Sequence, residues 1–142
     1  MTLLDDPHAP LVAAARAALA NAYAPYSGFR VGAAVAGASG AIHAGCNVEN
    51  ASYPVSLCAE RGAIAAAVAA GEHRLAAVAI VTASGDPCPP CGMCRQALAE
   101  FGPDMLVILV SSDGREVRHH LSDLLPAAFG PGFLGPREGE PR

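Results

Sequence analysis

The chain has 142 residues, the length of a single domain that can bury a hydrophobic core. Half of its residues are hydrophobic, it contains no lysine, and its net charge of -4 argues against a nucleic-acid partner, which would need a basic patch. The longest apolar run, residues 62–71, is too short for a membrane span of roughly 20 residues, so no membrane partner is expected.

The chain shows alternating signals for helices, strands and turns. Apolar periodicity indicates helices, runs of β-branched residues indicate strands, and Gly-rich segments indicate turns. In chain order, they predict a helix over 8–23, strands over 29–36 and 41–49 joined by a turn at 37–40, a loop over 50–57, a helix over 58–70, a strand over 75–83, a Pro-rich loop over 84–90, a helix over 91–102, strands over 105–111 and 116–120, and a helical turn over 122–125.

Strands that alternate with helices, with a hairpin near each end, predict an α/β fold. We expect a three-layer α/β/α sandwich with a mixed five-stranded sheet. Residues 1–129 are predicted to form one catalytic domain, and residues 130–142 a tail rich in Gly and Pro.

The N-terminal segment could be mistaken for a secretion signal. Residues 13–22 are rich in alanine, but they follow two aspartates and are interrupted by Arg16. We therefore expect a cytoplasmic protein. In that compartment five cysteines favour metal binding or free thiols over disulfides.

Two short segments carry the strongest chemical signal. Cys58-Ala59-Glu60-Arg61 and Pro90-Cys91-Gly92-Met93-Cys94 each open a predicted helix. A cysteine at a helix start is readily a thiolate. Three thiolates on one zinc ion would leave a fourth position open, as in catalytic zinc sites. The order Cys-x-Glu and then Pro-Cys-x-x-Cys is the signature of zinc-dependent deaminases.

Other cysteine sites are also compatible with these spacings. The three sulfurs could belong to buried structural cysteines. Cys88, Cys91 and Cys94 have the spacing that begins an iron–sulfur motif, although no further cysteine follows. A closed four-cysteine zinc site could use Cys88 or Cys46. The iron–sulfur and closed zinc sites leave Glu60 without a role.

Glu60 and Arg61 could be ordinary first-turn residues of a helix. Two positions after a ligand, Glu60 is instead placed to move protons between a water at the open zinc position, a ring nitrogen and the departing ammonia. Arg61 could offset the net negative charge of three thiolates and one zinc ion by hydrogen bonding to sulfur. We hypothesise that it tunes the zinc.

Asn47 and Glu49 stand two positions apart on a predicted strand and so face the same way. They could be a solvated strand end or could bind the hydroxyls of a sugar. Phe29 begins the partner strand and could belong to the core or pack against a flat base.

Long ordered strings occur over nearly the whole chain: Ala24-Pro25-Tyr26-Ser27 with Phe29, Val31 and Gly32, then residues 45–53 (GCNVENASY), residues 58–61 (CAER) and residues 89–96 (PPCGMCRQ). On these strings the chain resembles a known family, the short homotetrameric cytidine deaminases.

The resemblance implies a fold, a cofactor and a set of site residues. It implies one Zn²⁺ per subunit on Cys58, Cys91 and Cys94, with Glu60 as the proton shuttle. It implies that Asn47 and Glu49 bind ribose, that Phe29 packs on the pyrimidine, and that the backbone of Ala59 binds the base. It also implies a homotetramer with shared active sites, in which Tyr53 and Phe129 reach into neighbouring subunits.

The resemblance predicts hydrolytic deamination of cytidine and 2′-deoxycytidine in pyrimidine salvage. Three departures from the family pattern are Met93, where a smaller residue is usual, the unusual proline of residues 54–57 (PVSL) before the first ligand, and the extra thiol of Cys88. Three other functions remain open at this stage: deamination of a modified cytosine nucleoside, editing of a polynucleotide, and a non-catalytic zinc module.

Overall fold

The computed structural model describes residues 5–135 and residue 139. Its elements are α1 (Ala9–Leu19), β1 (Val31–Gly37), β2 (Ile42–Cys46), α2 (Ala59–Ala69), β3 (Leu75–Thr82), α3 (Gly92–Ala99), β4 (Leu106–Val110), β5 (Glu116–His120) and α4 (Leu121–Leu124), with single 3-10 turns at Tyr53–Val55 and Pro131–Leu134.

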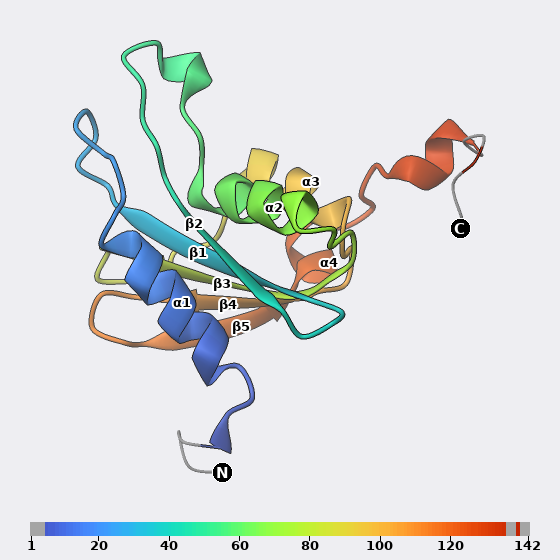
Figure 1. Ribbon diagram of the computed structural model, residues 1–142, viewed down its shortest axis with the longest axis horizontal. Coiled ribbons are helices and arrows are strands. Elements are labelled where there is room, and N and C mark those ends of the chain that lie inside the picture. Colours follow the sequence, from blue (N-terminus) through green and yellow to red (C-terminus); the bar gives the residue numbers. More distant parts are fainter. Residues whose placement is uncertain (1–4, 136–138, 140–142) are drawn as a thin grey trace.

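The five strands form one mixed sheet in the order β2-β1-β3-β4-β5 (Figure 1). β3 and β4 are parallel, and the other neighbours are antiparallel. β3 has the uninterrupted apolar sequence expected of a strand covered on both faces, and seven of its eight residues are buried. The predicted three-layer α/β/α architecture is therefore confirmed.

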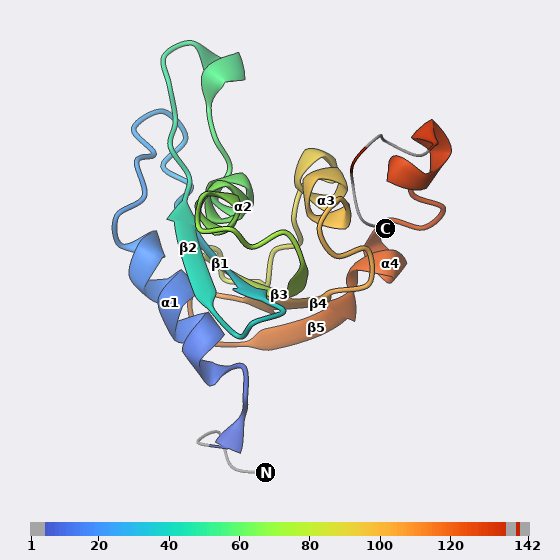
Figure 2. The same cartoon turned by 45° about the vertical axis from the view of Figure 1, so that its right-hand side comes forward.

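Helices cover the two faces of the sheet unequally. α1 packs on one face, where Leu11 and Ala15 meet Val81 and Ile108. α2, α3 and α4 lie on the opposite face (Figure 2). The cysteines singled out above lie at the starts of α2 and α3, as the N-cap residues Cys58 and Cys91 and in the first turn of α3 as Cys94, so this second face is the one that holds the chemistry.

Close contact between α2 and the edge strand β2 depends on a glycine. A Cβ atom on Gly45 would stand 2.4 Å from the backbone nitrogen of Ala63 and 2.7 Å from the carbonyl oxygen of Ala59. Only a residue without a side chain allows the helix to approach so closely. Gly45 therefore fixes the position of α2, the helix whose N-cap residue is Cys58.

Four predicted element ends differ from the structure by two or more residues, among them the end of α3, which lies at Ala99 rather than at residue 102. α1 ends at Leu19 rather than at residue 23. Phe29 precedes β1 instead of beginning it, and Asn47 and Glu49 lie beyond the end of β2. At β1 and β2 the cause is the Asn47 side chain, whose Oδ1 accepts from the backbone N–H of Val31 and whose Nδ2 donates to the carbonyl of Phe29. These bonds replace the strand ladder with side-chain contacts.

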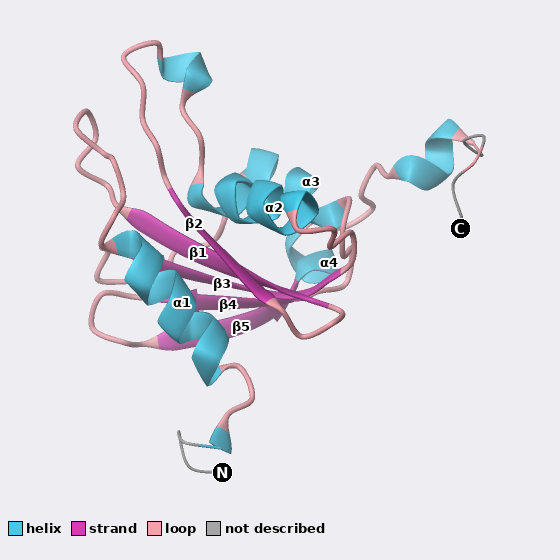
Figure 3. Ribbon diagram, viewed as in Figure 1, coloured by secondary structure: helices cyan, strands magenta, loops and turns pink. Residues whose placement is uncertain are grey.

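Two long loops leave the sheet at the same end of the molecule, one between α1 and β1 and one between β2 and α2 (Figure 3). Short backbone bridges tie them together: Val48 pairs with Tyr23 from the first loop and with Leu57 from the second. The loops therefore form one structured rim beside the start of α2.

Candidate active site

Three cysteine sulfurs converge where α2 and α3 begin. Cys58 is the N-cap residue of α2, Cys91 is the N-cap residue of α3, and Cys94 lies in the first turn of α3. Their Sγ atoms all lie within 4.8 Å of one another. Across the described ranges, 5–135 and 139, this is the one group of three or more His, Cys, Asp or Glu side chains close enough to share a metal ion.

Cys46 and Cys88 remain outside this group. The Cys88 thiol instead lies 3.8 Å from the carbonyl oxygen of Pro89. A closed four-cysteine site is therefore not formed, and neither is the iron–sulfur arrangement that would need Cys88. Three sulfur ligands leave a coordination position for a small molecule, as catalytic zinc requires.

Hydrogen bonds and burial shift the pKa values of two of the three cysteine thiols. Hydrogen bonds from the Cys94 thiol and the Arg61 guanidinium lower the pKa of Cys58 to about 5. Cys94 donates its proton to Cys58, and this bond together with burial raises the pKa of Cys94. The lowered pKa of Cys58 favours its thiolate, the form that binds a metal ion, and metal binding by Cys94 releases its proton.

Glu60 lies in the first turn of α2, two residues after Cys58, and is only 5% exposed. Burial raises the pKa of its carboxyl group, because the charged form loses hydration. A carboxyl group with a raised pKa both accepts and returns protons more readily near neutral pH. This is the property expected of a proton shuttle.

Arg61 contacts the first ligand directly. Its Nη2 lies 3.8 Å from Cys58 Sγ and donates to the carbonyl of Ser56 at 3.1 Å. The guanidinium therefore joins the loop that precedes α2 to the ligand sulfur. The contact expected from the sequence is present.

A pocket of about 390 Å³ lies against this cluster. Phe29, Asn47, Glu49, Ala59 and Glu60 all line it, together with Cys58 and Cys91. Its volume falls in the range of about 300 to 1,000 Å³ typical of small-molecule sites. Each residue predicted to bind substrate within one subunit thus lies in a single cavity beside the cysteines.

Comparison with known proteins agrees with this geometry. Residues 6–110 match the family model described as the cytidine and deoxycytidylate deaminase zinc-binding region. The cytidine deaminase of Mycobacterium tuberculosis is 47% identical over 121 residues, which cover 85% of this chain and 87% of that protein. The chain belongs to the cytidine deaminase family.

Further relatives extend the match. The cytidine deaminase of Sporosarcina psychrophila is 42% identical over 84% of this chain and 88% of its own length. The crystal structure of cytidine deaminase from Burkholderia pseudomallei has a TM-score of 0.82 and 45% identity, and covers 91% of this chain and all of that one. The likeness therefore includes fold and sequence together.

Membership of the cytidine deaminase family makes zinc the metal of this enzyme, and the donor set fits it. Three sulfurs on one tetrahedral zinc at about 2.3 Å stand roughly 3.8 Å apart. The observed separations of up to 4.8 Å need only about an ångström of side-chain movement to reach that arrangement. Cys58, Cys91 and Cys94 are thus the residues that would hold the ion.

The residues that resemble the sugar-binding pair of cytidine deaminases are themselves held by the rim. Glu49 accepts hydrogen bonds from the backbone N–H groups of Tyr26 and Ser27 and from the Ser27 hydroxyl. These bonds, led by that of the hydroxyl, hold the pKa of Glu49 below its usual value. Its carboxylate is therefore charged and oriented toward the pocket without a ligand.

Two residues with structural roles at this site were not predicted from the sequence. Ser27 fixes the Glu49 carboxylate. Arg95 donates to the carbonyl of Pro90 through Nε and to that of Leu124 through Nη1, both at 2.8 Å. The first bond steadies the residue before Cys91. Arg95 lies in the Cys-Arg-Gln string of the sequence, but nothing in that string indicates that its side chain donates to backbone carbonyls.

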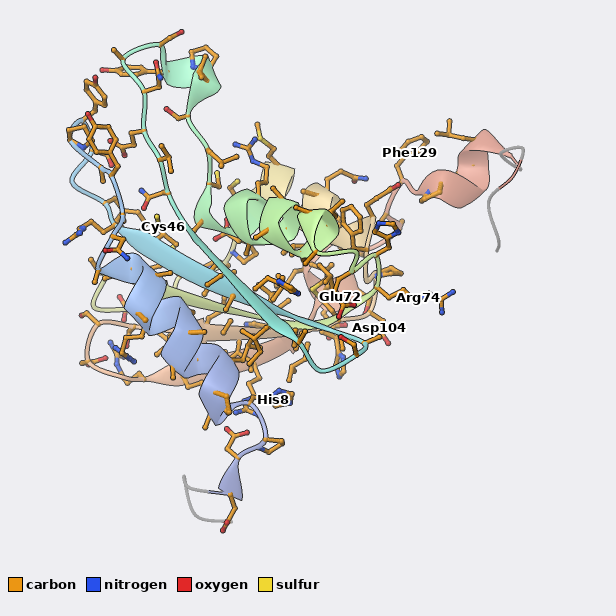
Figure 4. All side chains as sticks on the ribbon, viewed as in Figure 1. His8, Cys46, Glu72, Arg74, Asp104 and Phe129 are labelled. Atoms are coloured by element: carbon orange, nitrogen blue, oxygen red, sulfur yellow. The ribbon has the colours of Figure 1, made fainter. Side chains whose placement is uncertain are left out.

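The two residues expected to reach across subunits are exposed. Tyr53 is 70% exposed and meets the Tyr26 ring edge-on at 5.8 Å between centroids. Phe129 is 58% exposed and lies on the segment that leaves α4, outside the pocket of its own chain (Figure 4). Their role between subunits stays a prediction.

No helix within the described part of the chain is long and apolar enough to cross a membrane.

Proposed function

We propose that this enzyme hydrolyses cytidine and 2′-deoxycytidine to uridine and 2′-deoxyuridine, releasing ammonia, in pyrimidine salvage. The observation that carries the proposal is a cluster of three cysteine sulfurs and a buried glutamate beside one pocket of about 390 Å³. The identity with named cytidine deaminases supports the choice of cytosine nucleosides.

Zinc on the three sulfurs would supply a Lewis acid that makes water a stronger nucleophile near neutral pH. Glu60 receives the proton of the attacking water and delivers it to N3 of the ring. It then carries the second proton to the departing amine, so that water and cytidine become uridine and ammonia. Arg61 offsets negative charge at Cys58 through its sulfur contact.

Substrate binding in this proposal uses the rest of the pocket. Phe29 packs against the pyrimidine ring, and Asn47 and Glu49 bind the sugar hydroxyls. Ala59 is the first residue of α2, so its backbone N–H has no acceptor within the helix and is available to the base. The fixed Glu49 carboxylate favours a free nucleoside over cytosine, which lacks the sugar.

The active enzyme is proposed to be a homotetramer in which Tyr53 and Phe129 complete neighbouring sites. Their exposure within one chain supports a role at an interface. A cytoplasmic location is consistent with five cysteines that are all free of disulfides. The net charge of -4 supports a small-molecule substrate rather than nucleic acid.

A substrate panel tests this function. Purified zinc-loaded protein is incubated with cytidine, 2′-deoxycytidine, cytosine and a cytosine-containing oligonucleotide, and both ammonia and the uracil product are measured. Turnover of the two nucleosides, with little from cytosine and none from the oligonucleotide, is the expected result. Absence of turnover with both nucleosides would overturn the proposal.

A further inference from the structure

A buried hydroxyl group in the pocket lacks a hydrogen-bond partner. Thr82 is the last residue of β3 and only 2% exposed, yet its Oγ1 has no partner in the structure. Two other buried side-chain atoms of the described residues share this property, His43 Nε2 and Arg61 Nε, but neither residue lines the pocket. An unpartnered buried hydroxyl costs free energy and calls for an explanation.

The strand places this hydroxyl on the face that carries the chemistry. Thr82 pairs with Val31 and has the same orientation along β3 as Val78 and Ile80, which pack in the core under α2 and α3. Ile80 and Thr82 both line the pocket. In Figure 2, β3 runs beneath α2 and α3.

The residues that carry the reacting groups line the same pocket as Thr82. Cys58 and Glu60 come from the start of α2, and Cys91 comes from the start of α3. Ligands of open α/β sheets bind at the carboxyl ends of parallel strands, and β3 ends there beside its parallel neighbour β4. Thr82 thus lies at the reacting end of the pocket.

Several other polar side chains that line the pocket already have partners. Glu49 is held by Ser27, and Asn47 is held by the backbone beside Phe29. The hydroxyl of Ser56 accepts from the N–H of Asn50. Among the buried side-chain nitrogen and oxygen atoms of the described residues that line the pocket, Thr82 Oγ1 is therefore the one without a hydrogen-bond partner before a ligand enters.

We propose that the Thr82 hydroxyl contacts the substrate and hydrogen-bonds the substituent at position 4 of the pyrimidine. This inference rests on the proposed function, because deamination changes that substituent. The leaving amino group of cytidine can donate a hydrogen bond, and the oxygen that replaces it accepts one. A hydroxyl rotates and does both, so it can hold substrate and product in turn.

Two substitutions separate the hydroxyl from the shape of the side chain. Thr82→Val keeps the shape and removes the hydroxyl, and Thr82→Ser keeps the hydroxyl and removes the methyl group. We expect Thr82→Val to lower kcat/KM for cytidine about ten- to a hundredfold, mainly through KM, and to weaken uridine binding similarly. Thr82→Ser should stay within about threefold of wild type.

Zinc content and Tm complete the test. Thr82→Val should keep its zinc and have an unchanged or higher Tm, because it removes an unpartnered polar group. Wild-type values of kcat/KM and uridine affinity in Thr82→Val would overturn the inference while leaving the proposed function intact. Loss of zinc or of stability would make the hydroxyl structural and also overturn it. An inactive zinc-loaded wild type would overturn both.

Discussion

Glu60 is a buried carboxyl group that must lose its proton to act as a base. Burial raises its pKa above the ordinary 4.5. The net negative charge of three thiolates and one Zn²⁺ acts in the same direction. As pH falls, Glu60 is therefore protonated at a higher pH than an exposed glutamate, and its base function is lost earlier.

The pH profile of the enzyme should report this shift. We expect the acid limb of kcat/KM for cytidine to have a pKa above 4.5, measured between about pH 4 and pH 8 on zinc-loaded protein. A limb at or below 4.5, with zinc still bound, would contradict the assignment of Glu60 as the titrating base.

Arg61 is the second residue whose role is testable by itself. A hydrogen bond to a charged group is worth about 1.5 to 3 kcal/mol. Removing the guanidinium in Arg61→Gln should therefore lower kcat roughly ten- to a hundredfold. Arg61→Lys keeps the charge and should lose less. Unchanged turnover and zinc retention in Arg61→Gln would show that the contact with Cys58 has no part in tuning the zinc.

At the scale of elements, the packing of α2 on β2 positions Cys58 and Glu60. Gly45→Ala would place a Cβ atom inside the contact distance of the α2 backbone. Overpacking of this kind costs about 1 to 3 kcal/mol, so we expect Tm to fall by several degrees and activity to fall with it. Gly85→Ala is the matched control, because its Cβ atom would meet nothing within 4 Å. Equal Tm values for the two variants would contradict this account.

The helices and strands could be predicted because their signals are local. The apolar run of β3 and the cysteines at the starts of α2 and α3 needed only spacing and periodicity. The ends of β1 and β2 could not be predicted in the same way. They depend on the Asn47 side chain, which bonds backbone groups sixteen and eighteen positions away.

The candidate site was predictable to a similar extent. The ligands and Glu60 carry a distinctive pattern, and the substrate residues came from the family resemblance. Ser27, Thr82 and Arg95 were not predicted, because their roles arise from partners, or from a missing partner, in the folded chain. Such roles leave no trace in spacing along the sequence.

At the scale of the whole molecule, we expect four chains to assemble into a homotetramer. Light scattering should give a mass four times the 14.3 kDa of one chain. Phe129 is exposed and lies outside its own pocket, so Phe129→Ala should lower kcat/KM without loss of zinc. A monomer with full activity would contradict the proposed tetramer.

Mixed assemblies show whether Phe129 acts on a neighbour. Tetramers made only of Phe129→Ala subunits, or only of Glu60→Ala subunits, are each impaired. In a mixed tetramer, the intact Glu60 of a Phe129→Ala subunit can meet the intact Phe129 of a neighbouring Glu60→Ala subunit, which restores one complete site. Activity above the sum of the separate variants is the expected result. A hybrid no more active than that sum would place Phe129 outside the neighbouring site.

Cytidine deamination with Glu60 as the proton shuttle is tested most directly by comparing the turnover of cytidine by wild type and Glu60→Gln, with the zinc content measured in both. Wild type should produce uridine and ammonia, and kcat of the variant should be lower by a factor of about 10² to 10⁴. Both proteins should hold one zinc ion per chain. A zinc-loaded wild type without turnover, or a Glu60→Gln variant within about tenfold of wild type, would contradict it.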